Sequence, residues 1–139
     1  MDATQSEPLG APSQSLITVV HVVYALHAVG LGIGAFTASS LVGAFLFGWP
    51  SIVGVIINYV MRSDANDTWL ASHFRWQIRT FWLAGGASLL IALISAPLVL
   101  ALGLGLLTWF VGIFAVGVWA IYRIARGWLR LRDQQPMPF

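Results

Sequence analysis

Residues 80–122 decide the fold and read TFWLAGGASLLIALISAPLVLALGLGLLTWFVGIFAVGVWAIY, a stretch in which no side chain carries a formal charge. A helix needs about 20 apolar residues to cross the roughly 30 Å hydrocarbon core of a membrane, so this stretch is long enough to cross twice. Pro97 lies near its middle, and proline removes a helical hydrogen bond and disfavours helical geometry in the preceding residue. We therefore expect two membrane spans here, at residues 80–96 and 98–122.

A second uncharged stretch covers residues 16–61 and is again too long for one helix. The small polar residues 37–40 lie in its middle and predict a turn, which gives spans at residues 16–36 and 41–60. Pro50 should kink the second of these spans. Re-entrant hairpins are disfavoured, because irregular backbone exposed to lipid leaves polar groups unpaired. The sequence predicts an all-α integral membrane protein with four transmembrane helices.

The composition agrees with a membrane protein, because 58% of the residues are hydrophobic and only 9% are charged, against roughly 25% charged residues in soluble proteins. The chain contains no Cys, which excludes disulfides, thiolate metal sites and covalent haem attachment. Its basic residues are all Arg and lie beside apolar segments, whereas binding to nucleic acid requires a basic patch on a solvated surface. We expect the lipid bilayer, rather than nucleic acid, as the partner of this surface.

The positions of the Arg residues predict the orientation. With four spans, the segment before residue 16, residues 62–79 and the segment after residue 122 share one side, and every Arg lies there. Because positive charge accumulates in cytoplasmic segments, we expect a multi-pass protein of the bacterial inner membrane with both termini in the cytoplasm. Residues 1–15 are expected to form a disordered cytoplasmic tail, residues 16–132 the four-helix transmembrane domain, and residues 133–139 a C-terminal tail.

The segment 68–79, between the second and third spans, has helical periodicity with a polar and an apolar face. The polar face carries Thr68, Ser72, Arg75 and Arg79, and the apolar face carries Leu70, Phe74, Ile78 and Phe81. This pattern predicts an amphipathic interfacial helix at the level of the lipid headgroups. An extension of the third span, packed on the rest of the protein, explains the pattern equally well. After residue 122, Arg and apolar residues alternate again, and we expect them to anchor the C-terminus on the cytoplasmic leaflet.

Candidate lipid-binding or partner-binding side chains on the segment 68–79 are Trp69, His73, Arg75, Trp76 and Arg79. Trp and Arg are stable at the headgroup level, because each combines an apolar body with a polar end.

The candidate polar site inside the membrane consists of His21 and His27 on the first span and Asn58 on the second. The two His are about 120° apart on a helix, so they do not share one metal ion. The other spans contain no His for a haem and no span contains Asp or Glu for a proton pump. We expect no cofactor, and we expect neutral His side chains that hydrogen-bond to neighbouring helices, with Asn58 at the depth of His21.

Enzyme signatures are missing from the sequence: there is no phosphate-binding loop, no His pair at metal-binding spacing and no base beside the Ser residues of the spans. We therefore expect a non-enzymatic accessory or scaffold protein that binds other membrane proteins, or itself, through its Gly-lined helices and the amphipathic segment 68–80. Gly30 and Gly34 of the first span have a spacing that lets two helices approach closely, and we expect this pair to serve packing within the chain rather than dimerisation. One alternative is a small oligomeric channel or transporter with a path lined by His21, His27 and Asn58. Another is a lipid-binding module at the cytoplasmic face.

Four blocks of sequence carry a resemblance to a known family: residues 57–62, 68–70, 73–82 and 122–128. Together they resemble small proteobacterial inner-membrane proteins of unknown function, which are distantly similar to the four-helix subunit of the chloroplast inner-envelope protein translocon. The resemblance implies four helices with cytoplasmic ends, and it implies no activity.

Overall fold

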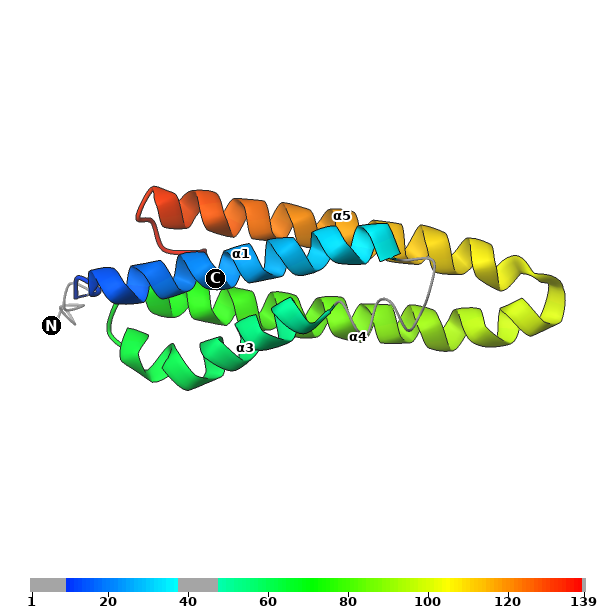
Figure 1. Ribbon diagram of the computed structural model, residues 1–139, viewed down its shortest axis with the longest axis horizontal. Coiled ribbons are helices and arrows are strands. Elements are labelled where there is room, and N and C mark those ends of the chain that lie inside the picture. The colour runs from blue at the N-terminus through cyan, green and yellow to red at the C-terminus, as the bar shows by residue number, and fades with distance from the viewer. Residues whose placement is uncertain (1–9, 38–47, 139) are drawn as a thin grey trace, which may run out of the picture.

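The computed structural model describes residues 10–37 and 48–138, and these residues form helices joined by short connections (Figure 1). The elements are α1 (Gln14–Thr37), α3 (Trp49–Met61), the short 3-10 helix η1 (Arg62–Ala65), α4 (Leu70–Leu102) and α5 (Leu104–Arg132). The part of the chain that the structure describes is thus an all-helical bundle.

Three of the described helices are long and apolar enough to cross a membrane: Gln14–Gly34 of α1, Leu70–Ala101 of α4 and Leu104–Arg132 of α5. The length and the apolar composition of these helices are those of a membrane protein. Helix α3 has 13 residues, which rise about 20 Å at 1.5 Å per residue, less than the hydrocarbon core. Residues 41–47 of the expected second span lie outside the described residues, as do residues 38–40 of the expected turn.

The helices run alternately up and down the bundle, so that chemically similar segments meet at one end (Figure 1). The start of α1, η1, the start of α4 and the end of α5 gather there, and all seven Arg lie on these segments. We call this the arginine end. At the opposite end, the hairpin of α4 and α5 extends beyond α1 and α3.

The turn of this hairpin lies at Gly103, and the expected break at Pro97 is wrong. Helix α4 continues through Pro97 to Leu102, and Gly103 then adopts a left-handed conformation with φ +70°, which glycine takes without steric cost. Gly105 follows, and a Cβ atom there would overlap the backbone of Ser95 and Val99. The close approach of the two helices thus requires glycine after the proline, and the proline itself is accommodated within the helix.

The expected interfacial helix 68–79 is not a separate element, because α4 begins at Leu70 and runs unbroken past residue 79. Leu70 and Phe74 are buried in the bundle, so the apolar face of this segment packs on protein. The periodicity of residues 68–79 therefore belongs to an extension of the third span and not to a separate interfacial helix. The segment after residue 122 is likewise the last part of α5.

The hydrophobic core lies at the arginine end, where α1, α4 and α5 meet. Its buried members are Leu16, Val20, Tyr24, Ala65, Leu70, Phe74, Ile124 and Leu131. The chain before α1 also contacts this end, because the Gly10 N–H donates to the Asp67 carbonyl at 2.8 Å. Of the expected tail 1–15, residues 1–9 lie outside the described residues, and the last two residues belong to α1.

Candidate functional site

His73 of α4 is the centre of a buried polar cluster at the arginine end. Its side chain is fully buried, and its Nε2 lies 2.8 Å from the Gln135 carbonyl oxygen. Its Nδ1 lies 3.0 Å from the Tyr24 hydroxyl. Because a carbonyl only accepts, Nε2 carries the proton of the neutral ring and Nδ1 accepts from Tyr24. The ring therefore links α1, α4 and the residues after α5.

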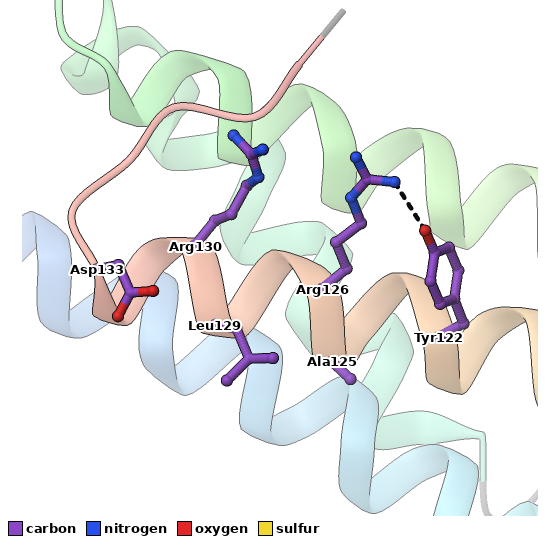
Figure 2. A pocket seen from close by; sticks show the side chains of 6 residues that line it. All are labelled: Tyr122, Ala125, Arg126, Leu129, Arg130 and Asp133. Atoms are coloured by element: carbon purple, nitrogen blue, oxygen red, sulfur yellow. Dashed lines mark hydrogen bonds between the residues drawn. The ribbon is translucent and has the colours of Figure 1, made fainter.

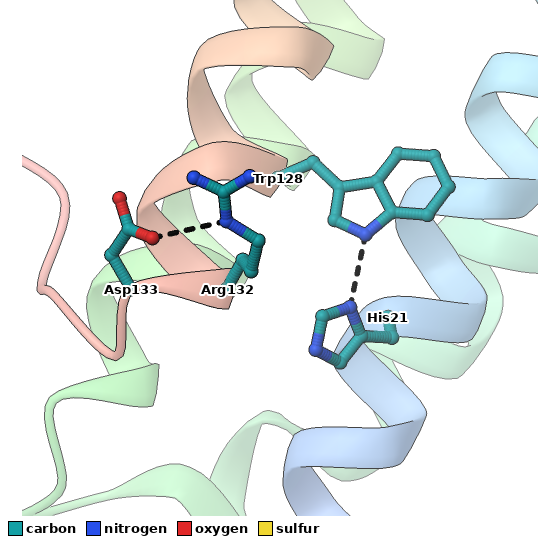
Figure 3. A network of polar contacts seen from close by, with 4 residues as sticks. All are labelled: His21, Trp128, Arg132 and Asp133. Atoms are coloured by element: carbon teal, nitrogen blue, oxygen red, sulfur yellow. Dashed lines mark hydrogen bonds and ion pairs between the residues drawn. The ribbon is translucent and has the colours of Figure 1, made fainter.

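Tyr24 extends this cluster to α5. Its ring stacks on Trp128, with centroids 6.4 Å apart and planes 11° from parallel. Gly127 makes room for it, because a Cβ atom at this position would overlap the Tyr24 hydroxyl. The Trp128 indole N–H in turn donates to His21 Nδ1 at 2.9 Å (Figure 3). Two of the three His residues are thus held by hydrogen bonds to aromatic side chains.

A second group of contacts joins α4 to α5 beside this cluster. The Trp76 indole N–H donates to the Arg123 carbonyl at 3.0 Å, and the Arg123 guanidinium lies 3.5 Å above the centre of the Trp76 ring. Arg123 Nε also donates to Thr80 Oγ1 at 2.8 Å. The cation is therefore stabilised by an aromatic face and a hydroxyl.

The residues after α5 fold back over the start of α4. The Met137 N–H donates to Ser72 Oγ at 2.9 Å, and the Met137 side chain is only 3% exposed. Gln135 supplies the carbonyl that His73 binds. The expected C-terminal tail 133–139 is therefore, over its described residues, part of the packed structure that covers His73.

His27 of α1 and Asn58 of α3 lie inside the bundle, apart from this cluster. His27 faces α3, where a Cβ atom at Gly54 would be 3.4 Å from the imidazole ring. Asn58, one helical turn after Gly54, is fully buried. His27 Nε2, both amide atoms of Asn58 and Gln77 Oε1 have no hydrogen-bond partner among the described residues. Such atoms are costly in a dry interior, at about 1–3 kcal/mol each.

The structure separates the residues of the expected intramembrane site. His27 and Asn58 lie on the facing sides of α1 and α3, whereas His21 turns toward Trp128 of α5. Gly30 packs against Ser51, while a Cβ atom at Gly34 would meet no other described residue within 4 Å. Gly30 thus allows α1 to pack closely on α3, whereas Gly34 has no such neighbour among the described residues.

The candidate surface on residues 69–79 divides into an inner and an outer part. His73 is buried, and Trp69 and Trp76 are half-buried, each against another side chain of the cluster. Arg75 and Arg79 are exposed. Among these five candidate residues, the two arginines are therefore the most accessible to a lipid or a partner.

Sequence reasoning missed Tyr24, Gln77 and the residues after α5 as parts of the site. Gln77 is buried one turn after His73 and donates to the Val20 carbonyl at 3.3 Å. Its spacing from Leu70 and Phe74, at helical intervals, was the available signal that it shares their inward face.

The described site consists of aromatic side chains and hydrogen-bonded polar groups. Among the described residues there is no group of three or more His, Cys, Asp or Glu that could hold a metal ion. The fold and the site define an all-helical bundle with three helices of membrane-spanning length and an aromatic, hydrogen-bonded cluster at one end. Comparisons with protein-family models, curated proteins and solved structures gave no match.

Proposed function

We propose that this protein is a non-enzymatic accessory or scaffold protein of the bacterial inner membrane that binds other membrane proteins. The observation that carries the proposal is the outer surface of the α4–α5 hairpin, which no other described residue covers. Its exposed large apolar residues are Leu89, Leu90, Leu93, Leu100, Leu104, Leu106, Leu107, Phe110 and Phe114. By contrast, the polar cluster at the arginine end is occupied by contacts within the chain.

Small residues on the same hairpin favour a helix as the partner. Cβ atoms placed at Gly85, Gly86 and Gly117 would meet no other described residue within 4 Å. Glycines on an outer face let a second helix approach closely, and close packing is a main source of helix association in lipid. Gly105, Gly112 and Gly127, in contrast, are filled by neighbours within the bundle.

The proposed topology has four spans with both termini in the cytoplasm. Its support is the collection of all seven Arg at one end of the bundle together with both described chain ends. The resemblance of residues 57–62, 68–70, 73–82 and 122–128 to small proteobacterial four-helix proteins supports the same arrangement.

Site-specific photo-crosslinking in cells tests the scaffold proposal. A crosslinking amino acid at Leu93, on the outer side of α4, should capture a partner protein or a second copy of the chain. The control is the same amino acid at Ile56 of α3, whose side chain is comparably exposed. Gly86→Leu should abolish capture at Leu93 while leaving the thermal unfolding midpoint unchanged. Equal labelling at both positions, or none at either, would contradict the proposal.

The second candidate function is a small oligomeric channel or transporter, and the unpaired polar atoms of His27, Asn58 and Gln77 favour it. Its path would follow the interior between α1, α3 and α4, and His21 would be outside it because it faces Trp128. Replacing His27 with Leu should then abolish solute flux into vesicles, whereas His21→Leu should leave flux intact. Flux that persists in His27→Leu would exclude this path.

A further inference from the structure

A groove of about 340 Å³ lies along one face of α5 at the arginine end (Figure 2). It is lined by Tyr122, Ala125, Arg126, Leu129, Arg130 and Asp133. These residues recur at intervals of three or four, which places them on one side of the helix. The groove is separate from the buried cluster around His73.

Two guanidinium groups, one helical turn apart, give the groove its positive charge. Arg126 donates to the Tyr122 hydroxyl at 2.7 Å, and Arg130 donates to the Pro136 carbonyl at 3.0 Å. Both acceptors are neutral, so neither contact reduces the charge. Each guanidinium has five N–H donors, and these hydrogen bonds use one donor of each. The two side chains retain the donors that an anion with several oxygens requires.

Asp133 also lines the groove, but its charge is paired. Its Oδ1 accepts from Arg132 Nε at 3.0 Å, which is the one ion pair found among the described residues (Figure 3). With this pair neutral as a unit, Arg126 and Arg130 determine the charge of the groove.

The same face of α5 is apolar in the direction of the bundle centre. Val111 and Val118 are exposed there, at helical spacing from Tyr122. The face therefore passes from aliphatic side chains to a tyrosine and then to two guanidiniums. This order matches a phospholipid, whose acyl chains lie in the hydrocarbon core and whose phosphate lies at its edge.

We propose that the groove binds the phosphate of an anionic phospholipid between Arg126 and Arg130, with an acyl chain along Val118 and Val111. A zwitterionic lipid is disfavoured because its cationic group would lie near the same guanidiniums. A free anion has no acyl chain and would leave the exposed Val111 and Val118 uncovered. The site thus takes phosphatidylglycerol-like lipids at the surface where α5 leaves the hydrocarbon core.

Native mass spectrometry of the full chain in detergent, with phosphatidylglycerol added, tests this site. Arg126→Gln and Arg130→Gln should each weaken binding about tenfold, the usual effect of losing one charge-assisted hydrogen bond. The matched control is Arg62→Gln, because Arg62 also lies beside a tyrosine ring, 5.2 Å from the centroid of Tyr59, and has no second Arg one turn away. It removes the same charge and should leave binding unchanged.

A second variant separates loss of the site from loss of folding. Leu129→Glu introduces a carboxylate into the groove at a side chain that is already exposed, and it should also weaken binding while the thermal midpoint stays the same. Equal binding of phosphatidylcholine, competition by inorganic phosphate, or an equal loss in Arg62→Gln would each overturn the proposal.

Discussion

The guanidinium of Arg123 lies 3.5 Å above the centre of the Trp76 indole ring, while the Trp76 indole N–H donates to the Arg123 carbonyl at 3.0 Å. The side chain of each residue thus contacts the other residue, and the two contacts join α4 to α5. A cation over an aromatic face contributes about 0.5–2 kcal/mol, with the larger values where water is excluded, and both Arg123 and Trp76 are half-buried. This reciprocal pair fixes the two helices at the point where they enter the arginine end.

Arg123→Lys should destabilise the protein although it preserves the charge. Lysine lacks both the planar group that stacks on Trp76 and the Nε–H that binds Thr80. We expect a loss of about 1–2 kcal/mol in the free energy of unfolding, measured by chemical denaturation in detergent. Arg62→Lys, at an exposed Arg beside Tyr59, should change it by less than about 0.5 kcal/mol. Equal effects would contradict the role of the Trp76 contact.

Tyr24→Phe should cost about 1–3 kcal/mol, because it leaves the buried Nδ1 of His73 without its donor. Tyr122→Phe is the control, since it removes an exposed hydroxyl that accepts from Arg126. Thermal unfolding of the two variants should separate them clearly. If Tyr24→Phe were as stable as Tyr122→Phe, the His73 hydrogen bond would not contribute to stability.

Gly127→Ala and Gly117→Ala should have opposite effects. A methyl group at residue 127 would overlap the Tyr24 hydroxyl, whereas one at residue 117 would meet no other described residue within 4 Å. Overpacking costs about 1–3 kcal/mol, and alanine is favoured over glycine in a helix by about 1 kcal/mol. Thermal unfolding should therefore give a lower midpoint for the first variant and an unchanged or higher one for the second. A drop of similar size in both would argue against the tight Tyr24 contact.

Asn58→Leu should leave stability unchanged or raise it. Both amide atoms of Asn58 are buried without a hydrogen-bond partner among the described residues, and leucine has a similar volume without the desolvation cost. The measurement is the midpoint of thermal unfolding in detergent. A loss of more than about 1 kcal/mol would mean that Asn58 has a hydrogen-bond partner in the native protein.

The sequence predicted the features that depend on hydrophobicity and charge. The uncharged residues 80–122 do form two antiparallel helices, and all seven Arg lie toward one end of the bundle. These features follow from local composition, because an apolar stretch of this length has few alternatives to a helical hairpin.

The features it did not predict depend on contacts between distant segments. The hairpin turns at Gly103 rather than at Pro97, since the approach of Gly105 to Ser95 and Val99 decides where the chain can reverse. The hydrogen bond of Gln77 to the Val20 carbonyl and the return of Met137 onto Ser72 rest on contacts across 57 and 65 residues. No periodicity within one segment contains this information.

The most direct test of this account is the side of the membrane on which the two ends of the bundle lie. The chain has no Cys, so single cysteines at Asn66, at the arginine end, and at Leu104, at the hairpin turn, can be labelled without background. A membrane-impermeant maleimide added to intact bacterial cells should label the cysteine at residue 104 and should reach the one at residue 66 only after the inner membrane is permeabilised. Labelling of both from the same side, or of residue 66 alone in intact cells, would contradict the proposed topology.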